Sequence, residues 1–120
     1  MLKVLALSLP LIVGPPPERS SAFFSSDQLE QLCLAPDDDP EGRTDVCVGY
    51  IAGAVDQLIL SLPDSSKRNT SCPLRAETVG DFRKLFLDYM RRNPGERGTS
   101  ASSTLVVALA PTIRCAFSTK

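Results

Sequence analysis

The side chains that could perform chemistry in this chain are its cysteines and carboxylates, because it contains no histidine. The absence of histidine excludes Ser-His-Asp triads, Cys-His pairs and histidine-ligated metal sites. Paired carboxylates could hydrolyse a glycosidic bond, but the spacing of the candidates does not set an acid and a base in a protected cleft. The candidates are Asp56, Asp81, Asp88 and Glu96. We therefore predict that the protein is not an enzyme and, since no glycine-rich phosphate motif is present, that it uses no cofactor.

The cysteines have spacings that favour disulfide bonds over zinc ligation, because no two of them form a Cys-x-x-Cys pair. An even number of cysteines in a small exported domain indicates two disulfides, and four cysteines allow three pairings. If each bridge closes a helical hairpin, the pairs are Cys33–Cys47 and Cys72–Cys115. In the chain-entropy account, these bridges contribute roughly 3 and 4 kcal/mol to stability.

Three adjacent carboxylates, Asp37 to Asp39, are the remaining group that could bind a metal ion. A calcium loop of the EF-hand type needs oxygen ligands at alternating positions, a glycine at the turn and a closing glutamate. Pro40 and the spacing do not fit that pattern. We therefore expect a solvated acidic loop and predict no metal site.

The first 22 residues predict a secretory signal peptide. A short apolar block follows Lys3, and Ser20-Ser21-Ala22 supplies the small residues that a signal peptidase recognises. The apolar block is too short to cross a bilayer. We expect cleavage after Ala22, a mature domain of residues 23–120, and no attachment of the mature protein to a membrane.

The mature chain would carry 11 basic and 13 acidic residues, a balance that points neither to nucleic acid nor to an acidic membrane surface. The charges are unevenly distributed along it. Residues 23–64 hold nine acids and one base, whereas residues 65–120 hold ten bases and four acids. We expect the two halves of one fold to attract each other, with head-to-tail pairing of two chains as the alternative.

The elements that must position these side chains are predicted to be helices, and the central one contains Cys47 and ends near Ser61. Its apolar residues follow the i, i+3, i+4, i+7 spacing of one helix face. They are Cys47, Tyr50, Ile51, Ala54, Leu58 and Leu62. Thr44 is expected to cap this helix. Gly49 and Gly53 lie on another face, where we expect a neighbouring helix to approach closely.

Three further helices are predicted. The first includes Cys33 and ends before Pro36, and the third begins at Thr78 and stops at Asn93-Pro94-Gly95, followed by a short loop. The fourth starts near Ala101 and is expected to be kinked or ended by Pro111. Together these patterns predict an all-α, disulfide-linked domain of about four helices.

The ordered motif Cys47-x-Gly-Tyr-Ile-x-Gly-x-x-Asp56, with other matching positions around it, resembles the Rap/Tai family of bacterial immunity proteins. The other positions are Leu32-Cys33, Cys72-Pro73, Thr78, Tyr89-Met90, Asn93-Pro94, Arg97, Ala101 and Cys115. The chain differs from the family pattern at Asp81-Phe82, Gly98 and Ile113-Arg114. The resemblance implies a helical periplasmic protein that blocks the active-site groove of a peptidoglycan amidase delivered by type VI secretion. Some members are dimeric, so it also implies that two copies could pair.

By position, we expect a helix end and the following loop to contact the partner. The predicted contact residues are Arg91, Arg92, Asn93, Glu96 and Arg97. The alternative for these residues is a solvated helix end with its cap. We expect Arg97→Glu to weaken partner binding while leaving the melting temperature nearly unchanged; if it unfolds the protein instead, the loop is structural. Two other functions stay open: an exported structural or stress-related helical protein without an enzyme partner, and a weak amidase or lysozyme-like activity of the chain itself.

Overall fold

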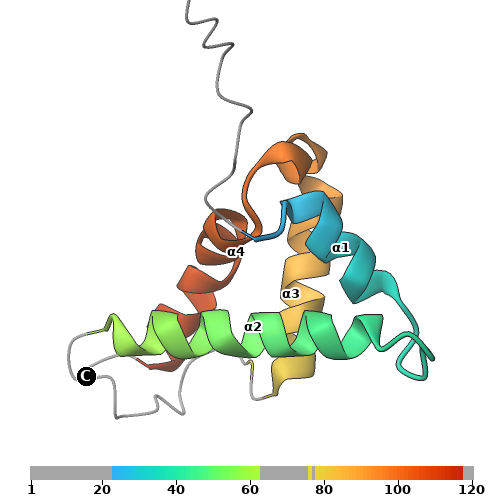
Figure 1. Ribbon diagram of the computed structural model, residues 1–120. Coiled ribbons are helices and arrows are strands. Elements are labelled where there is room, and N and C mark those ends of the chain that lie inside the picture. Colours follow the sequence, from blue (N-terminus) through green and yellow to red (C-terminus); the bar gives the residue numbers. More distant parts are fainter. Residues whose placement is uncertain (1–22, 63–75, 77, 118–120) are drawn as a thin grey trace, which may run out of the picture.

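The computed structural model describes residues 23–62, 76 and 78–117 as one all-α domain (Figure 1). The elements are α1 (Ser26–Leu34), α2 (Arg43–Leu60), α3 (Val79–Arg92), the 3-10 helix η1 (Pro94–Gly98) and α4 (Ala101–Ala116). The predicted fold of four helices is therefore confirmed. The predicted signal peptide and Cys72 lie outside the described residues. Within the described part of the chain, no helix is both long and apolar enough to cross a bilayer.

The longest helix, α2, contacts each of the other three helices and runs across them in Figure 1. Its buried apolar residues are Cys47, Ile51 and Val55, which repeat every four residues on one face. Around them lie large, fully buried side chains from the other three helices. These are Leu29, Phe86, Met90, Leu105, Leu109 and Ile113. One continuous core therefore holds all four helices together.

The third helix begins where the sequence predicts. The Thr78 hydroxyl accepts a hydrogen bond from the backbone N–H of Asp81 (3.2 Å), and the Asp81 carboxylate accepts one from the backbone N–H of Thr78 (3.0 Å). This reciprocal capping box satisfies two N–H groups that a helix start leaves without partners. One face of the helix then meets the core, with Phe82, Phe86 and Met90 buried.

The start of α2 differs from the prediction. Gly42, not Thr44, occupies the N-cap position, in the left-handed conformation (φ 70°) that favours glycine. The Asp39 carboxylate accepts hydrogen bonds from the backbone N–H (3.0 Å) and the guanidinium (2.9 Å) of Arg43. These hydrogen bonds hold the pKa of Asp39 below its usual value. The Thr44 hydroxyl instead lies 2.9 Å from the carbonyl oxygen of Ala35 and 2.6 Å from that of Pro36, at the end of α1.

The predicted close approach of a helix to Gly49 and Gly53 is wrong. Both glycines are exposed, and a Cβ atom added at either would meet nothing within 4 Å. The packing of α2 against its neighbours uses other faces of the helix. Among the described residues, therefore, no intramolecular contact accounts for the two glycines.

The region from η1 to the end of α4 is more helical than expected. The predicted loop after Pro94 contains η1, and α4 continues through Pro111 to Ala116. A proline inside a helix leaves the carbonyl of the residue four positions earlier without its usual donor. Pro111 and Val107 are both exposed, so that carbonyl lies on the solvent side of α4 and the helix need not end there.

Backbone hydrogen bonds and buried hydroxyls join the starts of α1 and α4. The backbone N–H of Ser26 donates to the carbonyl of Thr99 (2.8 Å), and that of Ala101 donates to the carbonyl of Phe24 (2.9 Å). The buried Ser26 hydroxyl donates to the Thr104 hydroxyl (2.7 Å). Residues that are far apart in the sequence are thereby held in fixed register.

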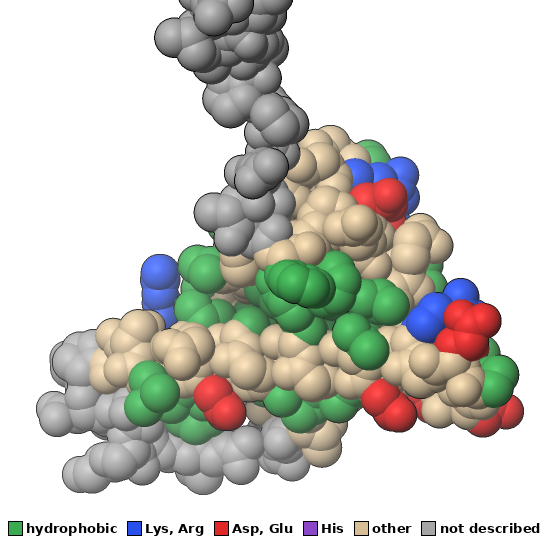
Figure 2. Space-filling view, in the orientation of Figure 1, with side chains coloured by type: hydrophobic (Ala, Val, Ile, Leu, Met, Phe, Trp, Pro, Cys, Tyr) green, Lys and Arg blue, Asp and Glu red, His purple; other side chains and the backbone are tan. Residues whose placement is uncertain are grey.

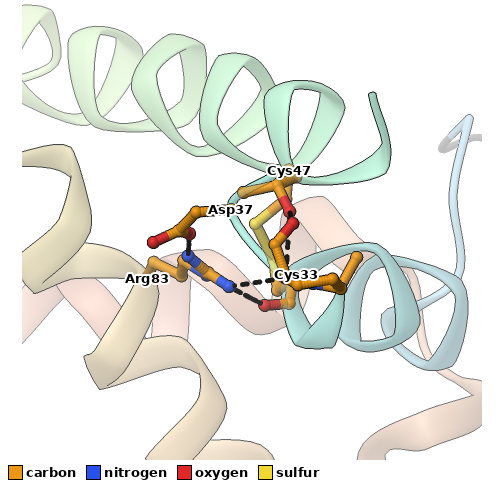
Figure 3. The surroundings of a disulfide bond; sticks show 7 residues. Cys33, Asp37, Cys47 and Arg83 are labelled. Atoms are coloured by element: carbon orange, nitrogen blue, oxygen red, sulfur yellow. Dashed lines mark hydrogen bonds and ion pairs between the residues drawn. A yellow bond between two sulfur atoms is a disulfide. The ribbon is translucent and has the colours of Figure 1, made fainter. Parts of the chain in front are cut away.

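The corner between α1 and α2 is held by a disulfide and an arginine (Figure 3). The predicted Cys33–Cys47 bridge is confirmed, with Cα atoms 5.1 Å apart. Arg83 reaches from α3 and donates to the carbonyl oxygens of Cys33 (2.8 and 2.6 Å) and Ala35 (3.1 Å), and it forms an ion pair with Asp37 (2.8 Å). We call this group the Arg83 clamp.

The second predicted bridge, Cys72–Cys115, is not tested by the described part of the chain. Cys115 is disulfide-bonded, and its predicted partner, Cys72, lies outside the described residues. The Cys72–Cys115 pairing therefore stays a prediction.

Candidate partner-binding site

The five residues predicted to contact a partner lie at the end of α3 and in η1. Arg91 and Arg92 are largely exposed, with 78% and 65% of their side chains accessible. Both form ion pairs with Asp88 one turn earlier, at 3.0 Å in the case of Arg92. The Asn93 side-chain amide donates to the carbonyl of Tyr89 (2.9 Å) and so satisfies an acceptor at the end of the helix.

Arg97 in η1 faces α1. Its guanidinium lies 3.2 Å from the carboxylate of Glu30, whose side chain is only 7% exposed. Glu96, in the same turn, accepts hydrogen bonds from the Thr99 hydroxyl at its backbone carbonyl (2.6 Å) and at its carboxylate (3.4 Å). Arg97 therefore has a structural role, because it compensates a nearly buried negative charge.

A surface concavity with a volume of about 490 Å³ lies between α1, α3 and η1. We call it the α1–α3 hollow. Its lining residues are Glu30, Leu34, Lys84, Leu87, Asp88, Arg91 and Arg97. Of the five predicted residues, Arg91 and Arg97 line the hollow, whereas Arg92, Asn93 and Glu96 do not. The structure thus brings two of them together across a concavity and leaves the other three beside it.

The sequence contained partial signals for the other lining residues. Lys84, Asp88 and Arg91 follow the i, i+4, i+7 spacing of one face of α3, and Leu34 is an apolar residue at the end of α1. The contribution of Glu30 depends on the packing of α1 beside η1. That packing joins residues 67 positions apart and cannot be inferred from helical spacing.

A second concavity, of about 620 Å³, follows α2 where α4 lies beside it. Its lining contains no charged residue and includes Gly49, Tyr50, Gly53 and Val106. The face drawn in Figure 2 carries apolar side chains above the middle of α2, with charged side chains around its margin. Unlike this concavity, the α1–α3 hollow combines apolar and charged side chains.

The carboxylates considered for catalysis have other roles or positions. Asp81 caps α3, Asp88 is paired with two arginines, and Asp56 is exposed on α2. In the acidic loop, Asp37 and Asp39 are each paired with an arginine. No group of three or more potential metal ligands occurs within the ranges that the structure describes.

The structure changes what we expect of Arg97→Glu. The substitution would place a second carboxylate against Glu30. The Glu30 carboxylate is nearly buried, and it would lose the positive charge that compensates it. We expect the free energy of unfolding to fall by about 1–3 kcal/mol, as when a buried group loses a charged partner. Urea denaturation measures the change.

Glu30→Gln provides the matched variant, because in Glu30→Gln/Arg97→Glu the new carboxylate faces an uncharged amide. The double variant should recover part of the lost stability. If Arg97→Glu alone unfolds at the wild-type urea concentration, the contact with Glu30 contributes nothing to stability.

A family model described as Rap1a immunity proteins matches residues 25–115. The match begins at the N-cap residue of α1 and ends in the last turn of α4, so it covers all four helices and the α1–α3 hollow. No curated protein and no solved structure matches the chain.

Proposed function

Because the chain belongs to the Rap1a family of immunity proteins, we propose that it binds and inhibits a peptidoglycan amidase delivered by type VI secretion. As an immunity protein, the chain is not an enzyme, and its partner is a cognate toxin protein. The amidase as target, and blockage of its active-site groove as the mode of inhibition, are the parts that we add.

The single observation that carries this proposal is the family match over residues 25–115. The surface chemistry is compatible with a protein partner. The end of α3 carries exposed arginines, next to a concavity lined by two leucines and several charged side chains. Arginine beside apolar surface is a composition enriched in the centres of protein interfaces.

We further propose that the protein acts in the periplasm. The predicted signal peptide of residues 1–22 would export it, and a disulfide such as Cys33–Cys47 persists in oxidising compartments. The periplasm also contains the peptidoglycan on which an amidase acts. A homodimer, which the family resemblance implies, remains a prediction for the mature protein.

The test is an inhibition assay with the mature chain and the amidase effector encoded nearest to its gene. We expect hydrolysis of purified peptidoglycan by the effector to stop at a one-to-one ratio of the two proteins. The chain alone should release nothing from peptidoglycan, and Arg91→Glu should weaken inhibition. Arg114→Glu is the matched control, because Arg114 is an exposed arginine on α4 and does not line the hollow.

Binding without inhibition would contradict the amidase mechanism while leaving the immunity role intact. No binding to the effector, in periplasmic pull-downs as well as in the assay, would favour the alternative of an exported helical protein without an enzyme partner. Hydrolysis by the chain alone would contradict its assignment as a protein without enzyme activity.

A further inference from the structure

We propose that the α1–α3 hollow receives a carboxylate side chain of the toxin together with an apolar side chain next to it. This inference rests on the proposed function, because it specifies the chemistry of the segment that the immunity protein recognises. The occupant is a short acidic-apolar segment of the toxin. The charges and the apolar surface of the hollow argue for it separately.

The negative charges of the hollow are already compensated. Glu30 is paired with Arg97, and Asp88 is held between Arg91 and Arg92. Lys84 is exposed and forms no ion pair with any residue that the structure describes. The hollow therefore carries an excess of positive charge, and a carboxylate from a partner complements it.

Apolar surface lies beside this charge. Leu34 is 59% exposed, and Leu87 is half-buried one turn from Lys84. A single exposed leucine is ordinary on a protein surface. Here two leucines border a concavity next to the exposed Lys84 ammonium group, so a single segment of the toxin can contact both the leucines and the charge. A carboxylate would pair with Lys84 while a neighbouring apolar side chain covers Leu34 and Leu87.

The uncharged concavity along α2 is a weaker candidate for recognition. It contains no charged side chain to select one partner over another. Electrostatic complementarity contributes mainly to specificity and to the rate of association. An immunity protein must recognise one toxin among many proteins, and the α1–α3 hollow offers a charge that can do so.

A first experiment tests the hollow on the mature chain without the toxin. Two peptides, acetyl-Leu-Glu-Leu-amide and acetyl-Leu-Gln-Leu-amide, are titrated at millimolar concentration while amide and methyl NMR signals are followed. We expect the glutamate peptide to shift signals of Leu34, Lys84 and Leu87, and the glutamine peptide to bind several-fold more weakly. Added salt should weaken the binding of the glutamate peptide, because salt screens the attraction between exposed charges.

Two variants probe the charge and the apolar surface, each with a control of similar exposure on α4. Lys84→Glu is compared with Arg114→Glu, and Leu34→Asp with Val107→Asp, since Leu34 and Val107 are 59% and 58% exposed. We expect Lys84→Glu and Leu34→Asp to abolish the changes in the NMR signals that the glutamate peptide causes. We expect both variants to weaken toxin binding on the order of tenfold. The controls should bind like wild type, and all four variants should keep the wild-type melting temperature within a few degrees.

The outcomes separate this inference from the proposed function. If the toxin binds wild type and Lys84→Glu equally well, or if the two peptides behave alike, the inference is wrong and the function stands. If the amidase is not inhibited, the function is wrong, and the peptide titration still decides the chemistry of the hollow. If Leu34→Asp instead changes the mass measured by sedimentation, a second copy of this chain occupies the hollow and the inference is wrong.

Discussion

Replacing both Cys33 and Cys47 with alanine should lower the free energy of unfolding by about 3 kcal/mol. The bridge closes a loop with a sequence separation of 14 residues, and loops of that length contribute roughly 3 kcal/mol by restricting the unfolded chain. Both sulfur atoms are also buried in the core, so the loss of packing adds to the effect. Equilibrium urea denaturation of the oxidised proteins gives the difference.

The same pair of proteins measured with a reductant separates the two contributions. Under reducing conditions neither protein has the bridge, so the remaining difference reports only the packing of the sulfur atoms. Any contribution from the disulfide of Cys115 is lost equally from both. If the difference in stability is the same with and without reductant, the Cys33–Cys47 bridge does not stabilise the fold.

Replacing Arg83 with methionine should cost about 2–4 kcal/mol, the range expected when charge-assisted hydrogen bonds are lost and their acceptors stay desolvated. Methionine keeps the apolar stem and removes the guanidinium. The carbonyl oxygens of Cys33 and Ala35 then lose their donor at the end of α1, and Asp37 loses its ion pair. The melting temperature and the urea midpoint both measure the change.

Lys84→Met is the matched control, because Lys84 is the adjacent residue on α3 and its charge forms no ion pair within the described ranges. It should change stability by less than about 0.5 kcal/mol, as surface substitutions usually do. Arg83→Lys should be intermediate, since an ammonium group cannot reproduce the planar fork of a guanidinium. Equal effects of Arg83→Met and Lys84→Met would show that the clamp contributes no stability.

The helices could be predicted because their signals are local. The stripe containing Phe82, Phe86 and Met90 and the cap at Thr78 are both encoded within about four residues of the positions they control. The Cys33–Cys47 pair followed from placing two cysteines at facing ends of consecutive helices. These parts of the fold needed no knowledge of how distant segments pack.

The errors involve interactions between elements. Thr44 has the residue type of a cap, but α1 ends beside it, so its hydroxyl serves the carbonyls of Ala35 and Pro36. Arg83, which the sequence pattern did not single out, reaches from α3 to the same corner. In both cases the unsatisfied carbonyls at the end of α1 determine the contact, and helical periodicity within a single segment does not contain that information.

The candidate site, too, combines residues that local sequence could identify with contacts between distant elements that it could not. Arg91 and Arg97 could be selected because they lie at a helix end and in the segment that follows it. Their relation to Glu30 and Leu34 depends on α1, which lies more than 50 residues earlier in the chain. Uneven charge in the sequence did predict that the two halves attract, and the ion pairs Arg83–Asp37 and Arg97–Glu30 join them.

The hydrogen bond between Ser26 and Thr104 spans 78 positions of the chain, and this has a consequence for the order of folding. A nascent chain that leaves the ribosome, or threads through a translocation pore, N-terminus first cannot form this contact until α4 has emerged. Before then α1 also lacks the core side chains Leu105, Leu109 and Ile113. Such late, non-local closure slows folding, so α1 would lack its native contacts with α4 until Ala101–Ala116 has emerged.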